Sequence, residues 1–202
     1  LARMLASSRP ISFQIVRSTS PAKLRATPAR NLRFVRGNMA RFAIAKRFSL
    51  VVIAYRAFQH LLTIEDQRSC LLHVRKHLRR KGRLVLHVFD PKLELCLPTT
   101  EAITMRSTTH DPTTDQVVAV EVSDRKNDPV TQTFSSIWRW TVTRNGLVVR
   151  THADVLRLRW TYRHEMRYLF ELTGFRVISE HSDFKGSPPR YGAEQVWVVE
   201  PT

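Results

Sequence analysis

The residues best suited to chemistry stand together at 54–60, directly after an apolar run at 50–53. His60 is the best candidate for a general base, because an unperturbed imidazole titrates near neutrality. The same segment offers four side chains that could line or orient a bound ligand: Tyr55, Arg56, Phe58 and Gln59. The alternatives are structural, since an aromatic ring can belong to the core and an imidazole can pack or cap a turn. Sequence alone leaves both readings open.

A second group of polar side chains opens a late helical segment. Tyr162 and Arg163 precede apolar residues at helical spacing, so they stand where a helix begins near a sheet edge. A solvated first turn would show the same residue types. Trp138 and Trp140 share a parity in a strand-like run, and they could cover a pocket, pack in the core or form an interface.

The elements that must position these side chains follow an α/β order. The β-branched run at 50–54 is typical of a strand covered on both faces. Thr63 is a plausible N-cap for a helix whose apolar residues recur on one face, and Gly82 is a natural stop for it. Residues 83–89 form another strand, closed by Asp90 and Pro91. Strand, helix and strand with short connections predict a parallel βαβ unit.

Residues 100–160 differ in character from the flanking segments. They are rich in alternating apolar residues, and Asn145-Gly146 is a strong hairpin signal. This predicts an antiparallel insert, which could cap a site or form a homodimer contact. The α/β pattern then resumes with a helix that stops at Gly174 and two strands, at 175–180 and 195–199, which are close enough to pair antiparallel.

The chain resembles the class I S-adenosylmethionine-dependent methyltransferases of the small-molecule type from about Val16 to its end. The segments that carry the resemblance, in order, are RFVRGNM at 33–39, FSLVVI at 48–53, RAFQHL at 56–61, LRRKGRLVLHVF at 78–89, YRHEMRYLFELTGF at 162–175, SDF at 182–184 and QVWV at 195–198. The resemblance implies a Rossmann-like sheet, S-adenosylmethionine as cofactor and methyl transfer to a small-molecule acceptor.

The resemblance also assigns cofactor contacts and shows where this chain departs from the family. The family's first strand ends in a glycine-rich loop, but no glycine precedes Gly37 here. Ser18 stands where the family has an acid for the ribose hydroxyls, and a serine lacks the charge-assisted grip of a carboxylate. Asn38 replaces the acid that accepts from the adenine amino group, and the Met39 backbone would serve the ring. We therefore expect a domain without its first strand and loop, with turnover left open.

Methyl transfer is an in-line displacement from a good leaving group, so its catalysis is mostly positioning. The resemblance makes His60 the candidate catalytic base. Tyr55, Arg56 and Phe58 become candidates for cofactor binding. The remaining candidates, for substrate binding, are Gln59, Tyr162 and Arg163. Sites in open α/β sheets lie at the carboxyl ends of the strands, which is where these segments fall.

Charge and composition leave several partners open. The formal net charge is +16, and no Asp or Glu occurs before Glu65. A basic surface can attract nucleic acid, so a non-catalytic nucleic-acid-binding protein is the alternative function. Residues 1–30 are expected to be a loose basic segment, or a targeting segment, ahead of a domain at 31–202. Cys70 and Cys96 show no metal or disulfide spacing, no apolar run is long enough to cross a membrane, and we expect a cytoplasmic protein without a metal.

Overall fold

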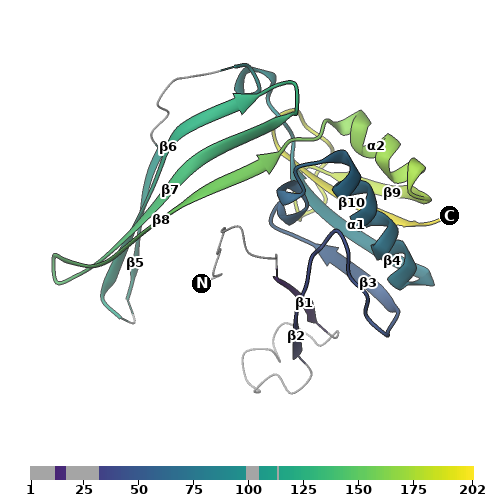
Figure 1. Ribbon diagram of the computed structural model, residues 1–202, viewed down its shortest axis with the longest axis horizontal. Coiled ribbons are helices and arrows are strands. Elements are labelled where there is room, and N and C mark those ends of the chain that lie inside the picture. Colours follow the sequence, from purple (N-terminus) through teal and green to yellow (C-terminus); the bar gives the residue numbers. More distant parts are fainter. Residues whose placement is uncertain (1–11, 17–31, 99–104, 113) are drawn as a thin grey trace.

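The computed structural model describes residues 12–16, 32–98, 105–112 and 114–202. Within these ranges the chain forms two α-helices, two short 3-10 helices and three sheets (Figure 1). No helix in the described part is long and apolar enough to span a membrane. The expected boundary between a loose segment at 1–30 and a domain at 31–202 stays a prediction, because most of the first 31 residues lie outside the described ranges.

The main sheet has four strands in the order β3-β4-β10-β9. Its members are β3 (Phe48–Ile53), β4 (Leu78–Phe89), β10 (Glu194–Pro201) and β9 (Phe175–His181). The strands β3 and β4 are parallel, whereas β10 runs antiparallel to both β4 and β9. The predicted parallel unit and the predicted closing antiparallel pair are therefore both confirmed.

Helix α1 (Ile64–His77) connects the two parallel strands and begins where the capping pattern predicts. The Thr63 side chain accepts a hydrogen bond from the Asp66 backbone N–H at 3.1 Å, which satisfies one of the orphan donors of the first turn. Its end was predicted wrongly: the helix stops at His77, and β4 already begins at Leu78.

Gly82 is therefore a strand residue rather than a helix stop. A Cβ atom at this position would lie 2.8 Å from the Phe48 carbonyl oxygen of the neighbouring strand. The missing side chain permits a close approach of two backbones at the start of the parallel pair. In the sequence, a glycine required for this strand contact cannot be distinguished from a glycine that ends a helix.

Helix α2 (Arg163–Leu172) follows the insert and ends before Gly174, as predicted. Gly174 has φ +74°, the left-handed conformation that commonly ends a helix. Residues of both helices belong to one core cluster with Leu84, Leu86 and Trp197 of the main sheet. Alternate residues of β4 enter that cluster, so both helices pack against the same face of the sheet.

The opposite face of β3 has no helix over it in the described part of the chain. Leu50 and Val52 are 55% and 52% exposed, and Val52 pairs with Val85, which alternates with the core residues of β4. The prediction that this strand is covered on both faces is therefore wrong for the described residues. The strand β3 is also an edge strand of the sheet. Its apolar sequence is typical of a strand buried on both faces, but no described residue covers the second face.

The predicted antiparallel insert is present as a four-stranded meander that projects from the body (Figure 1). Its strands are β5 (Met105–Asp111), β6 (Gln116–Asp128), β7 (Thr133–Arg144) and β8 (Leu147–Arg159). The turn between β7 and β8 falls at Asn145-Gly146, whose φ angles of 51° and 74° suit a tight hairpin. A small cluster that includes Phe134, Leu158 and Trp160 anchors the insert at its base.

The first two strands do not join the main sheet. The strands β1 (Ser12–Val16) and β2 (Leu32–Arg36) pair antiparallel as a separate two-stranded sheet. The methyltransferase resemblance implies instead that they belong to one sheet with β3. In doubly wound sheets the first strand lies in the middle, between the second and the fourth strand. The strands β1 and β2 could therefore join one sheet with β3 only if that first strand lay between this pair and β3.

Candidate functional site

The carboxyl ends of β3 and β4 lie at the same end of the main sheet, because the two strands are parallel. The predicted site segment directly follows β3 at this end. The 3-10 helix η1 (Ala57–His60) comes after the end of β3, and Asp90 comes directly after β4. Because β10 is antiparallel to β4, its first residue, Glu194, pairs with Phe89 at the same edge. Three segments far apart in the sequence thus supply polar groups to one place.

The turn that leaves β3 has an unusual backbone. Tyr55 and Arg56 have φ angles of 54° and 60°, so two successive non-glycine residues adopt the left-handed conformation. Each such residue costs on the order of 1 kcal/mol or more, and strain of this kind is concentrated at functional sites. Tyr55 is 85% exposed, whereas Arg56 turns back over the Phe89 ring, 5.4 Å from its centroid.

Arg56 belongs to an ion-pair cluster with Glu194 and His87. The Arg56 guanidinium bonds both oxygens of the Glu194 carboxylate, and one of these oxygens lies 2.7 Å from His87 Nε2. Burial alone would raise the pKa of Glu194, but the bonds from His87 and Arg56 outweigh it and lower the pKa to about 2. The buried Nδ1 atom of His87 has no hydrogen-bond partner among the described residues.

Sequence reasoning missed this cluster. A histidine in the middle of an apolar strand was a visible signal, because a buried polar group needs a partner. Its partner, Glu194, stands 107 positions away, and no local pattern connects the two. The cluster holds the strained turn after β3 against the start of β10.

His60 ends η1 and is half-buried. Burial lowers its pKa from the usual 6.5, because an imidazolium loses solvation there. In the described part of the chain no hydrogen bond reaches its ring. Burial therefore favours the neutral imidazole, which is the form that can accept a proton. Its role as a catalytic base stays a prediction.

Phe58 and Gln59 anchor η1 from within the protein. Phe58 is fully buried in the main core cluster, which favours the alternative of a core residue over a cofactor contact. Gln59 is also fully buried; its amide donates to the Arg159 carbonyl oxygen at 3.3 Å and accepts from the Phe89 N–H at 3.1 Å. Both ends of this amide serve backbone groups, so its observed task is to join η1 to β4 and β8.

The predicted adenine-side residues form a short turn before β3. The Asn38 side-chain oxygen accepts a hydrogen bond from the Ala40 N–H at 2.9 Å, which uses one of its two lone pairs within the turn. The Met39 side chain is buried in the main core. The Ser69 hydroxyl fixes the turn by donating to the Ala40 carbonyl oxygen at 2.7 Å. Ser18, the predicted ribose contact, lies outside the described residues.

Two of the three residues predicted to bind substrate, Tyr162 and Arg163, line a hollow of about 370 Å³ at the same end of the sheet, whereas Gln59 does not line it. Its walls are Asp90, Pro91, Leu93, Tyr162, Arg163, His164, Pro189, Arg190 and Tyr191. Arg163 pairs with Asp90 at 3.3 Å and also with the buried Glu180. Asp90 further accepts from the Gly192 N–H and the Gln195 amide, so the floor of the hollow is rigid.

A buried polar network joins the insert, α1 and α2 behind this edge. Its centre is Arg159, the last residue of β8, which is 2% exposed. The guanidinium donates to four side chains: Gln67, Gln132, Thr161 and Glu165. The Glu165 carboxylate also accepts from the Tyr162 N–H, so the same network sets the start of α2.

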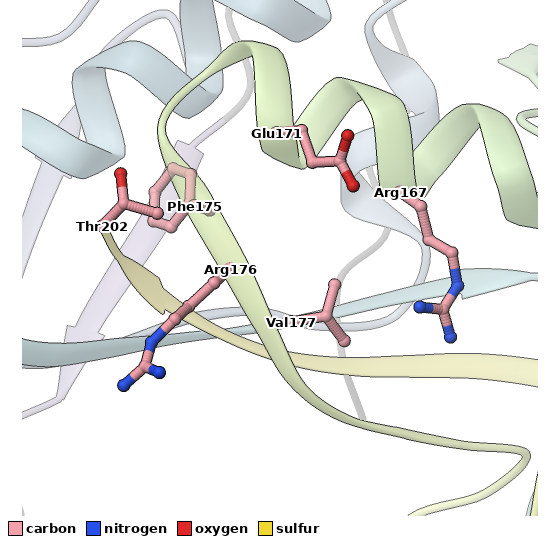
Figure 2. A pocket seen from close by; sticks show the side chains of 6 residues that line it. All are labelled: Arg167, Glu171, Phe175, Arg176, Val177 and Thr202. Carbon is pink, nitrogen blue, oxygen red and sulfur yellow. The ribbon is translucent and has the colours of Figure 1, made fainter.

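A larger hollow, of about 450 Å³, lies away from these residues (Figure 2). Its lining comes from α2, from the start of β9 and from the C-terminus: Arg167, Glu171, Phe175, Arg176, Val177 and Thr202. Figure 2 shows the Arg176 side chain extending away from the helix that carries Glu171. None of the predicted site residues lines it, so size alone does not identify the site.

Comparison with solved structures shows which fold this is. The CcbJ methyltransferase from Streptomyces caelestis aligns over 90% of this chain and 73% of its own, with 24% identity and a TM-score of 0.66. An S-adenosylmethionine-dependent methyltransferase from Clostridium acetobutylicum aligns over 83% and 63%, with 8% identity and a TM-score of 0.69. DesVI from Streptomyces venezuelae aligns over 83% and 64%, with 19% identity and a TM-score of 0.65.

These likenesses, all below 25% identity, establish the fold of the S-adenosylmethionine-dependent methyltransferases. The resemblance inferred from the sequence motifs is confirmed at that level. The chain spans between 63% and 73% of the three related structures. No protein-family model matches the chain, and no curated protein sequence matches it.

Proposed function

We propose that the chain is the acceptor-side part of an S-adenosylmethionine-dependent methyltransferase that acts on a small molecule. The observation that carries this proposal is the position of the polar groups. The strained turn at Tyr55 and Arg56, the neutral His60 and the Arg163 hollow belong to one sheet edge of a methyltransferase fold. In open α/β sheets, ligands bind at the carboxyl ends of the strands.

The described residues do not by themselves form a holding site for S-adenosylmethionine. One lone pair of the Asn38 oxygen serves its own turn, and Phe58 belongs to the core. No glycine occurs before Gly37, so the chain has no glycine-rich loop that could approach the cofactor closely. We therefore derive no step through the cofactor and assign this chain only acceptor-side tasks.

Those tasks are positioning and proton transfer. The Arg163 hollow would hold a small acceptor, and its ion pairs with Asp90 and Glu180 keep its shape. The neutral His60 imidazole would accept a proton from an acceptor nitrogen or oxygen that carries one. The Arg56–Glu194 pair would hold the turn between these two places.

The unpaired edge and the uncovered apolar face of β3 support a further part of the proposal. We propose that the cofactor-binding elements of the fold, a strand, a glycine-rich loop and a helix, pack against β3. Leu50 and Val52 lie exposed on the face opposite both helices, and the outer edge of β3 pairs with no strand in the described part. A parallel strand that ends in a glycine-rich loop would satisfy the edge, and its following helix would cover the apolar face.

Calorimetry with S-adenosylmethionine tests the proposal. We would compare the chain as it stands with a version preceded by a strand, a glycine-rich loop and a helix, and with a control in which valine replaces those glycines. Binding only by the glycine version is the expected result. If that version folds, as judged by a cooperative thermal melt, and still does not bind, the enzymatic proposal is rejected.

We also propose that the insert forms a homodimer contact. Val120 pairs with Trp140 and Val122 pairs with Trp138, so these four side chains share one face of the protruding sheet. The Trp138 and Trp140 rings lie 5.9 Å apart. Light scattering should then give twice the chain mass, and Trp140→Asp should give a monomer; a wild-type monomer at all concentrations contradicts it.

The cytoplasmic location stays a prediction.

A further inference from the structure

Eight basic side chains gather at the amino ends of the two parallel strands. Lys46 and Arg47 precede β3, Arg75 and Lys76 belong to the last turn of α1, and the other four stand in the run 79–83 at the start of β4. All eight are exposed. We call this set the basic end of the sheet; it lies at the opposite end of β3 and β4 from the candidate site.

The topology, rather than the sequence, brings these residues together. Phe48 pairs with Leu78, which places the start of β3 beside the start of β4. The Arg79 guanidinium lies 3.5 Å from the Ser49 hydroxyl, across the two strands. Because α1 ends at His77, directly before Leu78, its last turn reaches the same place. The rigid sheet therefore holds the positive charges near one another.

The charge of the basic end is hardly compensated. Among the described residues, Glu200 is the one carboxylate that forms an ion pair with any of the eight, at 3.8 Å from Arg83, and it also pairs with Arg176. The acidic residues of α1, Glu65 and Asp66, stand in its first turn, at the far end of the helix. Ordinary surfaces intersperse both signs, so a one-signed cluster of this size creates a strong local potential.

The composition of the basic end selects the kind of polyanion. The run 75–83 has no exposed large apolar side chain and no aromatic residue other than a histidine, and beside it on β3 the side chain of Leu50, which pairs with Arg83, is 55% exposed. Single-stranded nucleic acids are bound through stacking on aromatic rings, and amphipathic membrane-binding helices insert an apolar face beside their charges. Double-stranded nucleic acid needs neither, since its phosphates alone supply the contact.

We propose that the basic end binds the phosphate backbone of double-stranded nucleic acid without reading its bases. This function is separate from the candidate site and does not rest on methyl transfer. The run 79–83 spans roughly 13 Å as an extended strand, and a duplex presents about one negative charge per 1.7 Å. Several phosphates are therefore within reach of this run alone.

The expected salt dependence follows from the number of phosphates that are neutralised. If about four are contacted, the logarithm of the association constant falls with a slope of about −3.6 against the logarithm of the salt concentration. The affinity should then decrease roughly 150-fold between 50 and 200 mM salt. Affinity should be the same for duplexes of different sequence.

Fluorescence anisotropy of the full chain with a labelled 20-base-pair DNA duplex provides the test. The variant Arg79→Glu, Arg80→Glu, Lys81→Glu should bind at least tenfold more weakly than the wild type. The control reverses three exposed arginines of the insert, Arg106→Glu, Arg150→Glu, Arg157→Glu, and has the same net charge. This control should bind several-fold more tightly than the first variant.

Three results would overturn the proposal. Equal affinity of the two triple variants would assign the binding to overall charge or to the first 36 residues. Tighter binding of the matching single strand would indicate a stacking site. Stronger co-sedimentation with phosphatidylserine vesicles than with the duplex would indicate a membrane surface. Should the reversed variant fail to fold, the neutral variant Arg80→Gln must reduce the salt slope by about 0.9 for the same conclusion to stand.

Discussion

The buried Arg159 network offers the sharpest test of the described structure. The substitution Arg159→Leu keeps an apolar body in the site but removes a guanidinium that donates to four side chains. Two of these bonds are short, at 2.7 Å to Gln132 and 2.7 Å to Glu165. The other two join Gln67 at 3.0 Å and Thr161 at 3.2 Å.

The expected cost follows from what each partner loses. Breaking a buried ion pair typically costs about 3–5 kcal/mol. The Glu165 side chain is 32% exposed and can regain water, which reduces that figure. Gln67 is 1% exposed, and its side-chain oxygen would be left unpaired at a cost of about 1–3 kcal/mol. We therefore expect Arg159→Leu to lower the free energy of unfolding by about 3 kcal/mol.

Urea unfolding followed by circular dichroism measures this change. Arg157→Leu is the matched control, because Arg157 stands on the same strand and is exposed; it should cost less than about 0.5 kcal/mol. Arg159→Lys should fall between the two, since one ammonium cannot serve four acceptors as a planar fork does. A cost below about 1 kcal/mol for Arg159→Leu, or one equal to the control, would refute the network.

Three further outcomes are expected. Histidine NMR should give His60 a pKa below 6.5, because burial disfavours its charged form; a value at or above 6.5 contradicts the half-buried site. Glu194→Gln should be less stable than the wild type near neutral pH, and the difference should shrink as the pH falls from about 4.5 toward about 2. The reason is that the ionised Glu194 carboxylate stabilises the folded state fully above this pH window and loses that effect when it is protonated. A constant difference would exclude the ion pair. Gly82→Ala should lower the melting temperature, because its Cβ atom would lie 2.8 Å from the Phe48 carbonyl oxygen, a backbone atom that cannot swing away; an unchanged melting temperature would refute the close approach of the two strands.

Local signals in the sequence identified most of the elements. The Thr63 cap, the one-sided apolar residues of α1 and α2, and the Asn145-Gly146 turn act over a few residues, so the sequence contains their whole cause. The parallel unit and the closing antiparallel pair followed from the order and length of the segments. The candidate site edge followed in turn from that topology.

Signals with two physical origins were misread. Gly82 can stop a helix or admit a close strand, and only the neighbouring Phe48 carbonyl decides between them. The β-branched run of β3 indicates burial on both faces, but it does not say which segment provides the cover. Leu50 and Val52 are exposed because the described part of the chain brings nothing over them.

The tertiary structure alone decided how the candidate site is held together. It turned the Gln59 amide toward two backbone groups and joined His87 to Glu194 across 107 positions of sequence. It also gathered the basic end from three separate elements. Sequence by itself determined the order of the helices and strands and the segments that follow the carboxyl ends of the parallel strands, because those depend on local periodicity and order. Long-range polar pairing was set only by the folded register, since no local pattern records which distant groups will meet.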